Sequence, residues 1–191
     1  GNVMRLYQWK YCGILANNIT ARGSKITGNS EVNGIVAGIY TGSINDPSIA
    51  GRGSIHSYNS EITGNGTRRG IAAYFDSRAV NSTWLGTSKV AGVYLEGGSP
   101  SENIALTANN ATITGTYPDT SAAKDDEEAD GNCKGDYTYG GTYLYNNTVL
   151  EGTSIHYGVN MYAHASRTDP SQGDATNAHI IGTATTKVRY G

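Results

Sequence analysis

The sequence lacks a strong excess of charge of either sign and any long apolar run. Its 191 residues include 14 Lys and Arg against 16 Asp and Glu, which gives a net charge of −2. Nucleic-acid-binding domains typically have a clear excess of basic residues, so we expect no nucleic-acid partner. No apolar run approaches the roughly 20 residues of a membrane span, so we expect no membrane insertion by this segment.

Catalytic signatures are also missing. The sequence contains no Gly-x-Ser-x-Gly, no His-Glu-x-x-His and no clustered Cys/His spacing. The closely spaced glycines of GNSEVNG and GNGTRRG do not predict a phosphate-binding loop, because such a loop needs a helix after it and no helical apolar period follows. We therefore expect a protein that is not an enzyme and that has no cofactor.

Large apolar side chains are scarce. Only 37% of the residues are hydrophobic, and one Phe and two Trp stand against 14 Tyr. Tyr is the aromatic residue that tolerates a half-wet position. The composition therefore favours an extended protein with little deep interior over a compact globule.

What the sequence has in abundance is glycine, 26 residues in all, and many of them stand in a repeat. In SEITGNGTRRGIAAY (60–74) one short strand is expected to end at Gly64 and the next to open at Gly70. The same six-residue step recurs elsewhere, in the pairs Gly28 and Gly34, Gly86 and Gly92, and Gly152 and Gly158. A fifth copy has Val188 in place of the second glycine, and a sixth is split between Gly115 and Gly141.

This repeat predicts the fold class. Units of a few tens of residues are too small to bury their own apolar faces and must stack on one another. The first glycines of successive copies lie 22 to 37 residues apart, and short strands joined by loops accept such variation better than helical repeats do. The strands are rich in Ile, Val, Thr and Tyr. We predict an all-β parallel β-helix, or β-solenoid, of about six rungs with loop insertions, forming one domain over residues 1–191.

The run NSTWLGTSKVAGVYLEGG (81–98), with GIYTGS and ATITG, resembles the passenger segments of bacterial autotransporters. Phage tailspikes and fibres are similar in style. The resemblance implies a right-handed β-helix that serves as a rigid extracellular stalk or adhesive surface on a bacterial cell. No catalytic residue of either family can be placed on this sequence.

Two tyrosine–carboxylate pairs are candidates for contact with a glycan. Asp76 follows Tyr74, and Glu96 follows Tyr94, in neighbouring repeats. Paired carboxylates cleave glycosidic bonds at defined separations, and aromatic side chains beside them would also suit a sugar-binding strip. Solvated carboxylates at strand ends are the structural alternative.

The segment 116–140 is expected to be an acidic loop insertion. Within it Asp126, Glu128 and Asp130 alternate before Gly131, as ligands do at the start of a Ca²⁺ loop. The twelfth position of that pattern is Tyr137 instead of a bidentate acid, so the complete motif is absent. A Ca²⁺ site here and a plain exposed acidic loop both remain open.

The two cysteines, Cys12 and Cys133, suggest a disulfide. Several rungs are expected to separate them within one chain, so a bond would need either a folded-back insertion or a second copy stacked end to end.

These observations favour an extracellular, non-enzymatic β-solenoid that is adhesive or structural and that self-associates or contacts a host or cell-surface glycan or receptor. The alternatives are a tailspike-like glycan-binding or glycan-cleaving domain, and a pure assembly module that polymerises by strand addition.

Overall fold

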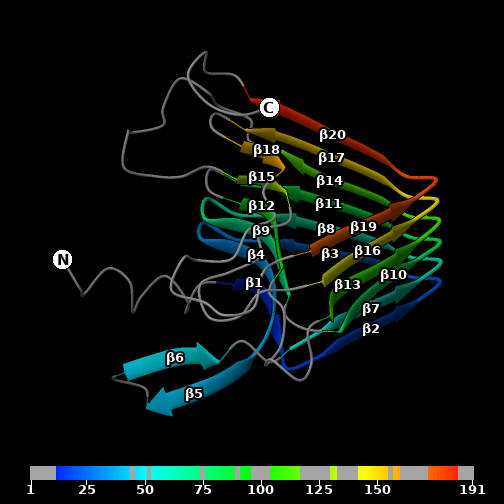
Figure 1. Cartoon of the computed structure of the whole chain (residues 1–191). Helices are drawn as coiled ribbons and strands as arrows, with labels where there is room; N and C mark the ends of the chain where they lie inside the picture. The colour runs from blue at the N-terminus through cyan, green and yellow to red at the C-terminus, as the bar shows by residue number, and fades with distance from the viewer. Residues whose placement is uncertain are drawn as a thin grey trace.

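The structure, a computed structural model, describes residues 12–43, 46–50, 53–73, 76–88, 91–95, 104–116, 130–132, 142–154, 157–159 and 172–184. Across these residues the chain winds through three parallel sheets of six strands each, and a separate two-stranded hairpin projects beyond the N-terminal end of the stack (Figure 1). The described residues contain strands and turns without a helix, and hence without a helix able to cross a membrane.

We call the three sheets A, B and C. Sheet A contains, in spatial order, β1 (Cys12–Ala16), β4 (Asn33–Ala37), β9 (Arg69–Ala73), β12 (Ala91–Leu95), β15 (Asp130–Asn132) and β18 (Tyr157–Val159). Sheet B contains β2 (Ile19–Arg22), β7 (Ile55–Tyr58), β10 (Ser77–Val80), β13 (Ile104–Asn109), β16 (Thr142–Asn146) and β19 (Gln172–Thr176). Sheet C contains β3 (Lys25–Asn29), β8 (Glu61–Asn65), β11 (Thr83–Thr87), β14 (Thr112–Thr116), β17 (Val149–Ser154) and β20 (His179–Ala184).

Each turn of the chain runs through sheet B, then sheet C, then sheet A, and the next turn pairs with it in parallel. The fold is therefore the parallel β-solenoid that the sequence predicts. The hairpin, β5 (Ile39–Ser43) and β6 (Asp46–Ala50), is antiparallel and interrupts the coil between β4 and β7.

The six-residue glycine step has a steric cause. The first glycines of all six copies stand in one register column of sheet C, which contains Gly28, Gly64, Gly86, Gly115, Gly152 and Gly182. A Cβ placed on Gly86 would overlap the carbonyl oxygen of Gly92, which lies in sheet A. Gly64 meets Gly70 in the same way. In these two pairs the second glycine therefore belongs to the sheet A strand that lies directly opposite the first.

The split copy differs from the prediction. Residues 142–146, expected to be the sheet A partner of the strand that ends near Gly115, form β16 and lie in sheet B. The sheet A position of that rung is taken by β15, inside the segment expected to be an acidic loop. Asp130 and Asn132 lack the Gly-aliphatic pattern of the other sheet A strands, so the sequence does not reveal the return of the chain to the stack.

The corner between sheets B and C is built on left-handed backbone. Five asparagines with φ between 47° and 49° occupy it, namely Asn59, Asn81, Asn110, Asn147 and Asn177, and Gly23 takes the same place in the first rung with φ of 56°. Asn and Gly are the residues that enter this region at low energetic cost. The backbone amide of every corner residue except Asn177, which lies in the last described rung, donates to a carbonyl in the next rung, as from Asn59 to Val80 at 3.0 Å.

A hydroxyl ladder continues this corner. Ser60 donates its Oγ hydrogen to the carbonyl of Tyr58 at 2.7 Å and accepts from the amide of Ser24 at 3.1 Å. Ser82 repeats both contacts one rung further on, and its Oγ accepts from the amide of Ser60 at 3.2 Å. Buried polar groups at a tight bend are thereby paired from one rung to the next.

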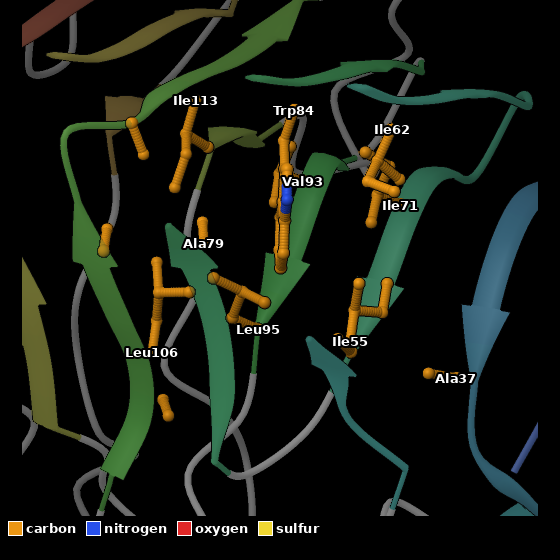
Figure 2. Close-up of a cluster of buried hydrophobic side chains, with 14 of the residues drawn as sticks. Ala37, Ile55, Ile62, Ile71, Ala79, Trp84, Val93, Leu95, Leu106 and Ile113 are labelled. Carbon is orange, nitrogen blue, oxygen red and sulfur yellow. The ribbon is translucent and has the colours of Figure 1, made fainter. Parts of the chain in front are cut away.

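The core is a set of stacked apolar rows. One row of sheet C contains Ile26, Ile62, Trp84, Ile113, Leu150 and Ile180 in register. Figure 2 shows Trp84 and Val93 among the apolar side chains that converge from several strands. Trp84 is fully buried, and its indole Nε1 donates to Oγ of Ser57 at 2.7 Å. The stack therefore has one continuous interior that holds its outer faces in fixed positions.

Candidate binding surface on sheet B

The titratable and aromatic contacts on the outward face of sheet B gather near its N-terminal end. We call this set the sheet B cluster; it consists of Arg22 at the end of β2, His56 and Tyr58 of β7, Asp76 before β10, and Arg78 of β10. Alternation along each strand turns these side chains outward, because residues such as Ala21, Ser57 and Ala79 between or beside them are buried.

Asp76 lies at the centre of the ionic contacts. Its carboxylate accepts from Nε and Nη2 of Arg78 at 3.3 and 3.1 Å, which is a forked ion pair across two residues. His56 donates from Nε2 to the Asp76 backbone carbonyl at 2.7 Å, and the same nitrogen lies 3.8 Å from the Asp76 carboxylate. Asp76 has a φ of 56°, in the left-handed region that Asp and Asn enter more readily than most residues other than Gly. The hydrogen bond and ion pair of Asp76 hold Arg78 in a fixed place.

The pKa of Arg78 is raised above its ordinary value, first by the hydrogen bond to Asp76 and then by the charge of that carboxylate. Arg78 therefore keeps the positive charge that an arginine ordinarily carries in a protein. Its charge is available to solvent because its side chain is about half exposed.

Arg22 stacks on Tyr58. Its guanidinium carbon lies 4.5 Å from the centre of the Tyr58 ring, which is the geometry of a cation–π contact. Arg22 and Tyr58 are register partners on adjacent strands, so the stack follows directly from strand pairing. The ring lies against the guanidinium, and Arg22 remains exposed to solvent.

The predicted glycan strip is not assembled as one surface by the described residues. Tyr94 belongs to sheet A, where it is 3% exposed and its ring lies under the Arg69 guanidinium at 3.8 Å. Asp76 lies in the sheet B cluster, and Tyr74 and Glu96 fall outside the described residues. Tyr94 therefore packs with Val36 and Ala72 as part of a second apolar cluster on sheet A.

The predicted Ca²⁺ ligands are placed only in part. Asp130 begins β15 and pairs with Ala91 and Tyr157, whereas Asp126 and Glu128 fall outside the described residues. In the part of the chain that the structure describes, no three His, Cys, Asp or Glu side chains gather to hold a metal ion. The Ca²⁺ site stays a prediction.

The cysteine pair faces a geometric constraint. Cys12 begins β1, and Asn132, which precedes Cys133, ends β15; β4, β9 and β12 lie between these strands. Four strand spacings amount to about 19 Å, while a disulfide needs Cα atoms within about 7 Å. Cys133 itself falls outside the described residues, so both disulfide arrangements stay predictions, and the separation of the strands favours the one between two copies. Burial raises the pKa of the Cys12 thiol, and contacts with Asn33 and Arg69 partly offset the rise.

The C-terminal rung exposes part of the core row. Ile180 follows Leu150 in that row, and Ile180 is 41% exposed while Leu150 is fully buried. The neighbouring Ile181 is 47% exposed. Among the described residues no strand pairs with the outer edges of β19 and β20. This rung therefore presents apolar side chains together with a strand edge.

The sheet B cluster was not predicted from the sequence, although a signal for it exists. Its strand residues stand one or three positions before the left-handed corner residue, as Arg22 does before Gly23 and Tyr58 before Asn59. Because the sequence repeat was defined on glycines of sheets C and A, the alignment of these positions in sheet B was missed.

No protein family, no curated protein and no solved structure matches this chain. The structure itself defines the class, a parallel β-solenoid of stacked three-strand rungs.

Proposed function

We propose that this chain is an extracellular, surface-displayed structural and adhesive segment without catalytic activity. The observation that carries the proposal is the sheet B cluster on a continuous stack, since the contacts of Arg22, Asp76 and Arg78 fix polar side chains on a rigid outward face. Rigid elements present binding groups with less loss of conformational entropy than mobile loops do. The resemblance of residues 81–98 to autotransporter passengers supports display on a bacterial surface.

Display of the chain on a non-adherent bacterium tests this role. The 191 residues are fused to an outer-membrane carrier, and the cells are counted after washing on host cells and on immobilised glycans. We expect at least a several-fold gain in retained cells over cells that display the carrier alone. Equal retention on every surface, with display confirmed by antibody, would contradict the adhesive role.

End-to-end assembly is a second candidate, favoured by the exposed core row of the C-terminal rung. Unpaired strand edges beside apolar side chains are templates for pairing with another chain. Ile180 and Ile181 are exposed beside edges that no other strand of the described residues covers. In this candidate β19 and β20 pair with the strands of a second copy.

Substitution of Ile180 by lysine is expected to abolish concentration-dependent assembly, because a charge at the open edge opposes strand pairing. Sedimentation velocity and electron microscopy provide the measurement. Ile104→Lys is the matched control, because Ile104 is also 41% exposed but lies in β13, inside the stack. A wild-type protein that stays monomeric at all accessible concentrations would remove this candidate.

A further inference from the structure

We propose that the sheet B cluster binds the acidic group of an extended acidic glycan, with Arg22 as the principal anion-binding residue. This inference rests on the proposed adhesive role and names the class of ligand that the surface recognises. The acid is a carboxylate or a sulfate carried on a sugar chain, because a guanidinium fork matches either group with two parallel hydrogen bonds.

Arg22 carries a positive charge that no carboxylate among the described residues balances. Its guanidinium lies over the ring of Tyr58, and no ion pair joins it to a carboxylate of the described residues. Lys25, three residues further on, is by contrast paired with Glu61 at 3.0 Å on sheet C. The two cations differ in pairing although they are close in sequence.

The sheet B cluster has a small excess of positive charge. The cluster contains two arginines and one aspartate, and counting His56 as neutral it has a net charge of +1, in a chain whose net charge is −2. The Asp76 carboxylate is paired with Arg78, so its charge is already balanced without Arg22. A single acidic group therefore meets a favourable local field, although the chain as a whole is slightly negative.

The spacing of side chains along the outward face of sheet B suits an extended ligand. Arg22 stands two rungs and two residues away from Arg78, which corresponds to about 12 Å between their Cα atoms. Beyond Tyr58 and Val80, the register column of Arg22 continues through Asn109 and Asn146. Nδ2 of Asn146 donates to Oδ1 of Asn109 at 3.2 Å. Apart from Val80, the column presents polar side chains, and its spacing of about 4.8 Å per rung suits the hydroxyl groups of a linear sugar chain.

The far end of the same face limits where acids bind. Asp174 of β19 lies in the register column that contains His56 and Arg78. Its negative charge opposes an acidic group at the C-terminal end of sheet B. The ligand is therefore anchored at its acid near Arg22 and extends along neutral hydrogen-bonding positions.

Calorimetric titration of the whole 191-residue protein with an oligogalacturonate hexamer and a heparin-derived hexasaccharide tests the proposal. We expect saturable binding of at least one of these acidic probes and no binding of maltohexaose, which has no acid. Arg22→Gln should weaken binding about tenfold, the effect of losing one charge-assisted hydrogen-bonded pair. The stronger of the two acidic probes identifies whether the acid is a carboxylate or a sulfate.

Lys25→Gln is the matched control, because it removes one positive charge three residues from Arg22 on a different sheet. We expect its affinity to stay within about twofold of the wild type, since Lys25 belongs to sheet C and is paired with Glu61. Equal losses for the two variants would overturn the site and leave only general electrostatics. Equally tight binding of hexaglutamate would overturn the glycan as the ligand class.

The outcomes also separate this inference from the proposed function. Retention of displayed cells on host surfaces together with no binding of either acidic probe would overturn the inference and leave the adhesive role standing. Binding that depends on Arg22, without any retention of displayed cells, would support the site and contradict the adhesive role.

Discussion

Replacing Gly86 by alanine is expected to lower the free energy of unfolding by about 3 kcal/mol or more. The new Cβ would overlap the carbonyl oxygen and carbon of Gly92 in sheet A. Backbone atoms on both sides are fixed by strand pairing with the neighbouring rungs, so the overlap cannot be relieved by a change of side-chain rotamer. Urea unfolding followed by far-ultraviolet circular dichroism measures the effect.

Gly23→Asn is the control for this prediction. Gly23 has a φ of 56°, no atom lies within 4 Å of its added Cβ, and Asn occupies the equivalent corner in five other rungs. We expect this variant to match or slightly exceed the stability of the wild type, because Asn restricts the unfolded chain more than Gly does. A Gly86→Ala protein as stable as Gly23→Asn would show that the sheets do not approach each other at the paired glycines.

Replacing Trp84 by alanine is expected to cost about 3 to 5 kcal/mol, the range for loss of a buried large aromatic side chain. Trp84 is fully buried in the row between Ile62 and Ile113. Its removal leaves a cavity and eliminates the hydrogen bond that the indole Nε1 donates to Oγ of Ser57. Equilibrium unfolding is measured by circular dichroism. Tryptophan fluorescence is unsuitable for the comparison, because the substitution itself removes a fluorescent residue.

Leu85→Ala is the neighbouring control on the same strand. Leu85 points to the opposite face of β11 and is 39% exposed. Exposed substitutions of this kind usually change stability by about 0.5 kcal/mol or less. Similar costs for the two variants would mean that sheet C does not turn its Trp84 row inward.

The sequence predicts the architecture because the strongest constraint on this fold is steric and falls on glycine. Gly64 and Gly70 must both lack a Cβ where sheets C and A meet. The constraint is therefore visible in the sequence as paired glycines at a constant six-residue spacing. The variable intervals between copies indicate loops at the corners. The resulting prediction of a parallel β-solenoid is confirmed by the three parallel sheets.

Other features could not be predicted from that step. The chain reaches sheet A at β15 through Asp130 and Asn132, because backbone pairing with β12 and β18 needs no particular side chain there. The sheet B cluster depends on which residues become neighbours between rungs, such as Arg22 beside Tyr58. These residues are 36 positions apart, and only the register of the stack brings them together.

The proposed function is tested most directly by comparing cells that display the wild-type chain with cells that display the Gly86→Ala chain, at equal surface density, for retention on host cells and on acidic glycans. If adhesion depends on the rigid stack, wild-type cells are retained and Gly86→Ala cells fall to the level of the carrier alone. Equal retention of both, with the variant shown to be unfolded on the cell by its sensitivity to protease, would contradict the account of a rigid adhesive β-solenoid.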